Sequence, residues 1–150
     1  MTISEFWQEF LRSADLDDST AYIESFYFDL TEEWANKLLA LVLAGKKKAT
    51  ASSLPAYGIE GKSVPQVGDY SIVTDWDGNP CCVIKTAAIT IIPFDEMTYD
   101  ICKREGEDDS LESWKNGHRH FFTEEGKTLG YEFSEDMPVV FEDFEVVFTV

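Results

Sequence analysis

The spacing of apolar residues changes character near Gly68, and this change limits the folds that the chain can adopt. Before Gly68, apolar side chains recur every three or four residues, which is the period of an amphipathic helix. After it, apolar and β-branched runs alternate or are bounded by turn residues such as Asp77-Gly78, as in strands. The predicted strands are Tyr70–Thr74, Cys81–Ile92, Val139–Phe141 and Phe144–Val150. We therefore expect an α+β fold in which helices come first and a small sheet or barrel joins strands that are distant in sequence.

The helical part of the pattern predicts five segments. Thr2 with Glu5 has the spacing of a capping box, and Gly45 stands where a left-handed helix end is expected. The predicted helices carry Phe6 to Leu11, Tyr22 to Phe26, and Trp34 to Val42 after Thr31, followed by a short helix over 94–104 and one that begins at Asp109 and passes Trp114 and Phe122. The stretch from Leu54 to Asp69, rich in glycine and proline, is expected to be a loop.

Length and charge narrow the class of protein. The 150 residues are typical of one domain, with a helical extension over 1–24 and a core over 25–150. The net charge of −17 repels phosphate backbones, which argues against a general nucleic-acid binder. No apolar run approaches the roughly 20 residues of a membrane span, and the N-terminus lacks the pattern of a signal peptide. We expect a cytoplasmic protein with no membrane partner, whose three cysteines stay reduced.

The run Gly45-Lys46-Lys47-Lys48-Ala49-Thr50 gathers three of only 12 basic residues. The simpler interpretation is a solvated helix C-terminus, where cations suit the helix dipole. The functional interpretation is a lysine beside a hydroxyl group, in which a partly desolvated amine can take a proton from the hydroxyl.

A second charged segment, from Arg104 to Trp114, contains five carboxylates. It is either a solvated loop and helix start or the source of a carboxylate partner for Lys47. His118 and His120 are the only histidines, and their spacing on a helix points them to different faces, which argues against a paired metal site. His118 shares the face of Trp114 and is either a half-buried, hydrogen-bonded side chain or a lining residue of a pocket.

These residues carry a resemblance to a known family. Gly45-x-Lys47-x-x-Thr50 resembles the Gly-x-Lys-x-x-Thr signature of the ASCH domain family. The resemblance to its larger bacterial members covers about residues 25–150. It extends through Pro65-x-x-Gly68-Asp69, Pro93-Phe94, Glu105-Gly106-Glu107, Ser110-Leu111-x-x-Trp114-x-x-x-His118, Phe121-Phe122 and Met137-Pro138-Val139-Val140.

The resemblance implies a small β-barrel, similar to PUA RNA-binding domains, with helices packed around it and a cleft beside the signature. Certain small members are amidohydrolases that deacylate N4-acetylcytidine, with the signature lysine and threonine acting together with a glutamate. By this resemblance Lys47, Thr50 and Glu107 are the expected catalytic residues, with Glu105 as the alternative carboxylate. Thr50 would attack the amide carbonyl and Lys47 would accept its proton. No cofactor and no metal ion are expected.

The remaining expectations concern the ligand. Lys46, Ser52, Tyr57, Trp114 and His118 are the expected substrate-binding residues, with Ser52 standing where small members carry arginine. The alternative is a module that binds or cleaves single-stranded RNA without metal. It would hold phosphates with Lys46, Lys47, Lys48 and Lys62 and stack bases on Tyr57, Trp76 or Trp114. A closed pocket favours a nucleoside, whereas a positive groove favours RNA. The sequence leaves the oligomeric state open.

Overall fold

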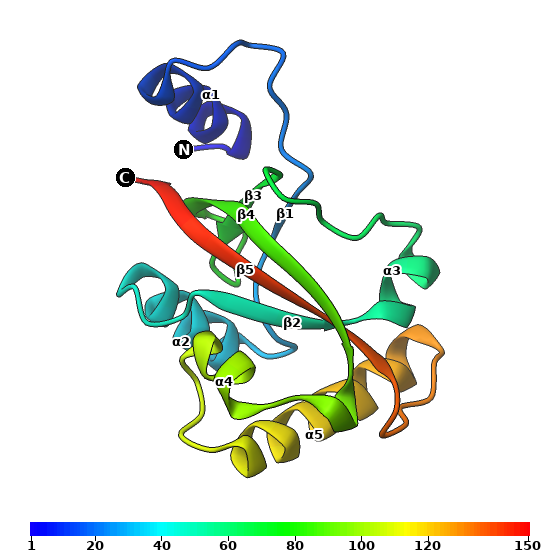
Figure 1. The fold of residues 1–150 in the computed structure, drawn as a ribbon. Coiled ribbons are helices and arrows are strands. Elements are labelled where there is room, and N and C mark those ends of the chain that lie inside the picture. Colours follow the sequence, from blue (N-terminus) through cyan, green and yellow to red (C-terminus); the bar gives the residue numbers. More distant parts are fainter.

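The five strands form one strongly curved sheet that closes partway into a half-barrel (Figure 1). The computed structural model describes residues 1–150. Across the sheet the strands are β1 (Glu24–Phe26), β3 (Tyr70–Thr74), β4 (Pro80–Pro93), β5 (Pro138–Thr149) and β2 (Ala49–Ser53). β1 pairs in parallel with β3, and the other pairs are antiparallel. The predicted α+β fold, with helices around a sheet built from distant strands, is confirmed.

Helices surround this sheet, and side chains cap three of them. The helices are α1 (Ile3–Ala14), α2 (Glu32–Leu43), α3 (Leu54–Glu60), α4 (Tyr99–Cys102) and α5 (Leu111–Leu129), with single 3-10 turns at Phe94–Glu96 (η1) and Lys103–Glu105 (η2). Thr2 and Thr31 accept the backbone N–H three residues ahead, as expected. Ser110, rather than Asp109, does the same for α5. None of these helices combines the length and the apolar character needed to cross a bilayer.

The predicted second helix is wrong, because residues 24–26 form β1. Ser25 lies opposite Ile72 of β3, and the Ile23 N–H donates to the Tyr70 carbonyl at 2.8 Å. Pairing with a strand 47 residues further along the chain therefore overrides the local helical spacing, as tertiary context commonly does.

Three other boundaries also differ. Residues 54–60 form α3 instead of a loop, and Pro55 is tolerated in the first helical turn because no N–H is needed there. The expected helix over 94–104 is broken, since the backbone of Met97 and Thr98 is extended between η1 and α4. The terminal strand is continuous, and the register of its pairing with β4 shifts twice, between Val83 and Ile84 and between Thr86 and Ala88.

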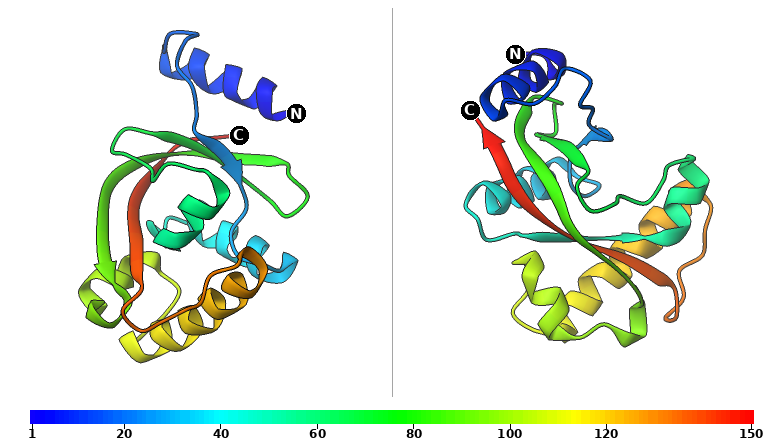
Figure 2. Two further views of the ribbon diagram at one scale, coloured as in Figure 1. Left: turned by 90° about the vertical axis from the view of Figure 1, so that its right-hand side faces the viewer. Right: turned by 45° about the horizontal axis from the view of Figure 1, so that its top comes forward.

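Apolar clusters fix α1, α2 and α5 to different parts of the sheet. Ile72 and Val73 are neighbours in β3 and point to opposite faces. Ile72 packs with α1, whereas Val73 packs with α2, so these helices cover opposite faces of that strand (Figure 2). α5 packs through Trp114 and Phe122 against the first half of β5. β2, at the edge of the sheet, therefore lies where the α2 and α5 layers meet.

Candidate functional site

A cavity of about 520 Å³ lies along the free edge of β2. Its wall comes from the segment that enters α2 (28–34), from β2, from the loop over 105–108 and from α5. Both Thr50 and Ala51 line it, and successive strand residues point to opposite faces, so the cavity wraps around the strand edge. Its volume falls within the range of about 300–1,000 Å³ that is typical of small-molecule sites.

Lys47 is the buried cation of this wall. The chain turns at Gly45 with a positive φ of 75°, and of the three following lysines only Lys47, 2% exposed, points inward. Its Nζ donates to the Ala49 carbonyl at 2.8 Å, to Glu107 Oε2 at 2.7 Å and to Glu105 Oε1 at 3.3 Å. An ammonium group has three protons, and three acceptors surround this one. The geometry therefore favours a charged lysine that holds its neighbours in place.

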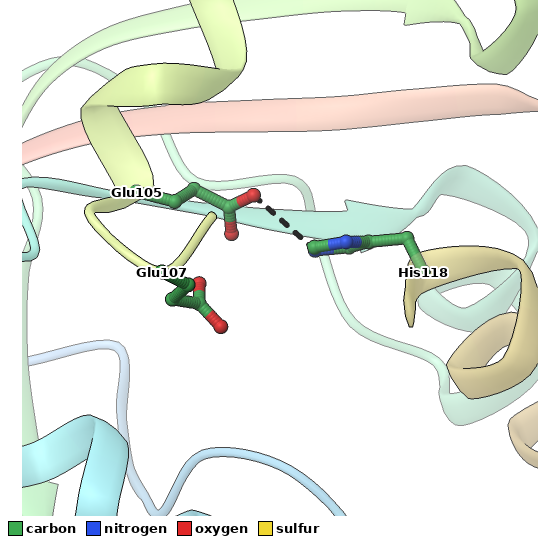
Figure 3. Close-up of side chains that lie close together, drawn as sticks. All are labelled: Glu105, Glu107 and His118. Atoms are coloured by element: carbon green, nitrogen blue, oxygen red, sulfur yellow. Dashed lines mark ion pairs between the residues drawn. The ribbon is translucent and has the colours of Figure 1, made fainter. Parts of the chain in front are cut away.

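Gly106 explains how two carboxylates reach one lysine. Its φ of 70° turns the loop, and a Cβ at this position would overlap the backbone carbonyl of Lys46. The absence of a side chain lets the loop lie directly against the lysine segment. As a result Glu105 and Glu107, on either side of Gly106, project toward the same region as His118 of α5 (Figure 3).

Glu105 is a buried hub with a full set of donors. One carboxylate oxygen accepts from Lys47 and from the Ala51 N–H at 3.1 Å. The other accepts from the indole N–H of Trp114 and lies 3.2 Å from His118 Nε2. Burial alone would raise the pKa of Glu105, but the charges of His118 and Lys47 outweigh it and hold that pKa well below its usual range. Glu105 is thus an ionised anchor.

Glu107 and His118 face the cavity beside this anchor. The Glu107 side chain is 17% exposed, and burial, together with the charge of Glu105, raises its pKa to about 7 despite the opposing effect of Lys47. Burial disfavours the charged form of His118, but Glu105 raises its pKa above the ordinary value. Both ring nitrogens face oxygen acceptors, Trp114 O at 2.9 Å and Glu105, which is the arrangement of an imidazolium. Glu107 is therefore the wall group whose proton exchanges near neutral pH.

Thr50 also lines the cavity, but no hydrogen bond joins its hydroxyl to Lys47. A general base must direct a lone pair at the proton that it removes. The Lys47 amine instead points its protons at three oxygens. The expected transfer of a proton from Thr50 to Lys47 thus has no counterpart among the contacts of this structure.

The expected substrate-binding residues divide into two groups. His118 lines the cavity, whereas Lys46, Ser52, Tyr57 and Trp114 do not. Lys46 is exposed, and Tyr57 lines a separate hollow beside α3. Trp114 is fully buried and stacks on His118 with ring centroids 4.1 Å apart, so it supports the site from behind.

Several lining residues were not predicted. Trp34 was predicted only as one of the regularly spaced apolar residues of a helix, yet it is 47% exposed and borders the cavity. Phe28, whose ring centroid lies 5.2 Å from Lys47 Nζ, follows the segment that was predicted as the second helix and that forms β1. Gly117 and Glu124 carry no sequence signal that distinguishes them from ordinary surface residues of a helix.

Glu105, Glu107 and His118 also satisfy the spacing of a metal site, since one ligand atom of each lies within 4.8 Å of the others. In this structure Lys47 supplies the positive charge between the two carboxylates. The whole cavity wall carries five carboxylates, Asp29, Glu105, Glu107, Asp108 and Glu124, against one lysine and the imidazolium of His118. The wall is thus suited to a neutral or positively charged ligand rather than to a polyanion.

Comparison with known proteins places the chain in a family. A sequence model of the ASCH domain matches residues 24–148. The crystal structure of an ASCH domain from Lactobacillus crispatus has 36% identity and a TM-score of 0.86, covering 95% of this chain and 92% of the other. A protein from Enterococcus faecalis has 34% identity and a TM-score of 0.88, covering 97% and 87%.

A more distant structure, a mutant of the ASCH protein of Zymomonas mobilis, shares the fold with a TM-score of 0.52 at 10% identity, over 85% of this chain and 75% of that one. No curated protein matches the chain. The family model covers most of the sequence, and the two structures that exceed 30% identity cover almost all of it. This protein belongs to the ASCH domain family.

Proposed function

We propose that this protein is an amidohydrolase that removes the acyl group from an N4-acylated cytidine nucleoside. The observation that carries the proposal is the cavity that Thr50 and Glu107 both line, beside the buried lysine Lys47. An acylated nucleoside is neutral, so neither the acidic wall nor the net charge of −17 opposes its entry.

Thr50 hydrogen-bonds neither Lys47 nor Glu107 in this structure, so the shared cavity wall and the pKa of Glu107 are what support a division of roles that differs from the sequence-based expectation. Glu107, with its pKa of about 7, serves as the general base and then as the general acid. In the first step the Thr50 oxygen bonds to the acyl carbon, and the C–N bond breaks. The hydroxyl proton passes through Glu107 to the leaving amino nitrogen. Water then hydrolyses the acyl ester and releases the carboxylic acid. Lys47 holds Glu107 and stabilises negative charge that develops beside it.

Binding of RNA is the alternative that the wall disfavours. Its five carboxylates would repel a phosphate backbone, and Lys46 and Lys48 lie outside it. A strand of RNA would have to contact these lysines from the outer surface, with an affinity that falls steeply with salt.

The test is incubation of the purified protein with N4-acetylcytidine, followed by measurement of cytidine. We expect turnover. Its kcat/KM should rise as the pH increases through about 7, because Glu107 must be ionised to act as the general base. Thr50→Ala and Glu107→Gln should each lower kcat by about 10²–10⁴. Lys46→Ala is the matched control, because this exposed lysine adjoins Lys47 but does not line the cavity. Absence of turnover, together with salt-sensitive binding to single-stranded RNA, would contradict the proposal and favour the binding module.

A further inference from the structure

Gly117 lies inside α5, and the packing of the protein itself does not account for a glycine there. Glycine weakens a helix relative to alanine. At Gly126, the other glycine of α5, a Cβ would overlap the Tyr131 carbonyl, so close packing requires glycine. At Gly117 a Cβ would meet no heavy atom within 4 Å, and the backbone has no positive φ. What distinguishes Gly117 is its place in the cavity wall.

Trp34, on the α2 side of the same cavity, is a second unexplained feature. Its helical position would suit a core residue, but it is the most bulky of the exposed apolar side chains. Lys37 Nζ lies over the indole, 4.7 Å from the ring centroid, and thus covers one of its faces. Trp34 also borders the cavity, as do the apolar residues Leu30 and Phe121. A large aromatic surface left open beside a cavity is typical of a binding site.

We propose that Trp34 and Gly117 form the seat of a planar ring of the ligand. Trp34 offers the face on which the ring stacks, and the missing side chain of Gly117 leaves room for the ring against the α5 backbone. The inference rests on the proposed function in that this ring is the base of the nucleoside whose amide is hydrolysed. Because the seat concerns binding, its test does not require turnover.

The experiment measures the affinity of the protein for N4-acetylcytidine and cytidine by calorimetry, at a temperature where every variant is folded. Trp34→Ala should weaken binding by about 5- to 150-fold, the range that loss of base stacking on an aromatic side chain produces. Gly117→Ala and Gly117→Leu should weaken it progressively, with about tenfold or more for leucine because its side chain fills the seat. Both Gly117 variants should nevertheless melt at a higher temperature than the wild type, since each removes a helix glycine.

Gly58→Leu supplies the matched control. Gly58 is also a glycine within a helix where a Cβ meets nothing, but it does not line the cavity. This variant should bind the nucleosides as the wild type does. N-acetylglucosamine, an acetamide without an aromatic ring, should not bind measurably to the wild type.

The possible outcomes distinguish a failure of the proposed ring-binding seat from a failure of the proposed hydrolysis. Binding that depends on Trp34 and Gly117 without any release of cytidine supports the seat and contradicts the proposed hydrolysis. Turnover whose KM is unchanged in Gly117→Leu and Trp34→Ala overturns the seat and leaves the hydrolysis standing. Failure of the wild type to bind either nucleoside, or equal binding of N-acetylglucosamine, also overturns the seat.

Discussion

Two glutamates separated by one glycine differ sharply in chemistry because their surroundings differ. Glu105 accepts from Lys47, Ala51 and Trp114 and faces His118, so no lone pair is left for a ligand. Glu107 has one hydrogen-bonded partner, Lys47, and keeps part of its surface in the cavity. Opposed environments of neighbouring carboxyl groups are a common way to separate a fixed charge from a proton-transfer group.

The protonation of Glu107 predicts a pH dependence of stability. The folded protein holds this proton up to about pH 7, whereas the ordinary pKa is 4.5, so folding takes up a proton between these values. Since the folded state then binds more protons than the unfolded state, this group makes the protein less stable as the pH rises from about 4.5 to 7. Glu107→Gln removes the titration. We therefore expect the free energy of unfolding of Glu107→Gln, measured in urea, to increase relative to that of the wild type from about pH 4.5 to 7. Above about pH 7 the difference between the two proteins should stay constant.

The comparison is a difference between two proteins, which cancels the titration of groups remote from Glu107. The titration of His118 does not cancel fully, because the charge of Glu107 helps to raise the pKa of that histidine. A difference that is flat with pH, or that grows as the pH falls below 4.5, would show that Glu107 titrates normally.

At the scale of elements, the edge strand β2 depends on side chains from elsewhere in the chain. Lys47 Nζ donates to the Ala49 carbonyl, and Glu105 accepts the Ala51 N–H. These two side chains occupy backbone groups that would otherwise be open to pairing with another strand. The ion pair of the site therefore also protects the free edge of the sheet.

Glu105→Gln tests this dual role. The glutamine amide group would meet four donors with only one acceptor oxygen, so its NH2 would confront N–H groups on either side. We expect a loss of about 3–5 kcal/mol in the free energy of unfolding, the usual effect of breaking a buried ion pair. Hydrogen exchange at the Ala51 amide should also accelerate. The exposed Glu132→Gln is the control, and an unchanged urea midpoint in Glu105→Gln would refute the anchor role.

At the scale of the molecule, the N-terminal helix α1 lies on a different side of the sheet from α2 and α5, which border the candidate site (Figure 1). α1 precedes the segment that the family model matches, and it covers the face of β3 and β4 that carries Ile72 and Val83. The cavity lies beyond β2, where α2 and α5 meet. α1 thus contributes to stability without taking part in the cavity wall.

Phe6→Ala provides the corresponding test. Phe6 is fully buried in the α1 cluster, so its truncation should lower the free energy of unfolding by about 3–5 kcal/mol. In the Phe6→Ala variant, the pH dependence of the unfolding free energy that we attribute to Glu107, between about pH 4.5 and 7, should persist. Gln8→Ala, exposed on the same helix, should leave both quantities unchanged. If folded Phe6→Ala lost this pH dependence between about pH 4.5 and 7, α1 would be shown to shape the site.

The amino-acid sequence by itself determined the parts of the protein that depend on neighbours in the chain. Caps and periodicity identified α1, α2 and α5, and the apolar run and turn identified β3 and β4, because these signals act within a few residues. Through its resemblance to the ASCH domain signature, the segment after Gly45 also indicated Lys47 as the lysine of the site, and Lys47 is the buried one of the three lysines.

Only the tertiary structure decided what joins segments far apart. Glu105 and Glu107 lie 58 and 60 residues from Lys47, so no local pattern could show that one would be a buried anchor and the other a cavity acid. Helical spacing placed Trp34 on an apolar face, but whether that face meets a core or a cavity depends on where α5 packs. The contacts that set pKa values and exposure are long-range, and a one-dimensional pattern does not contain them.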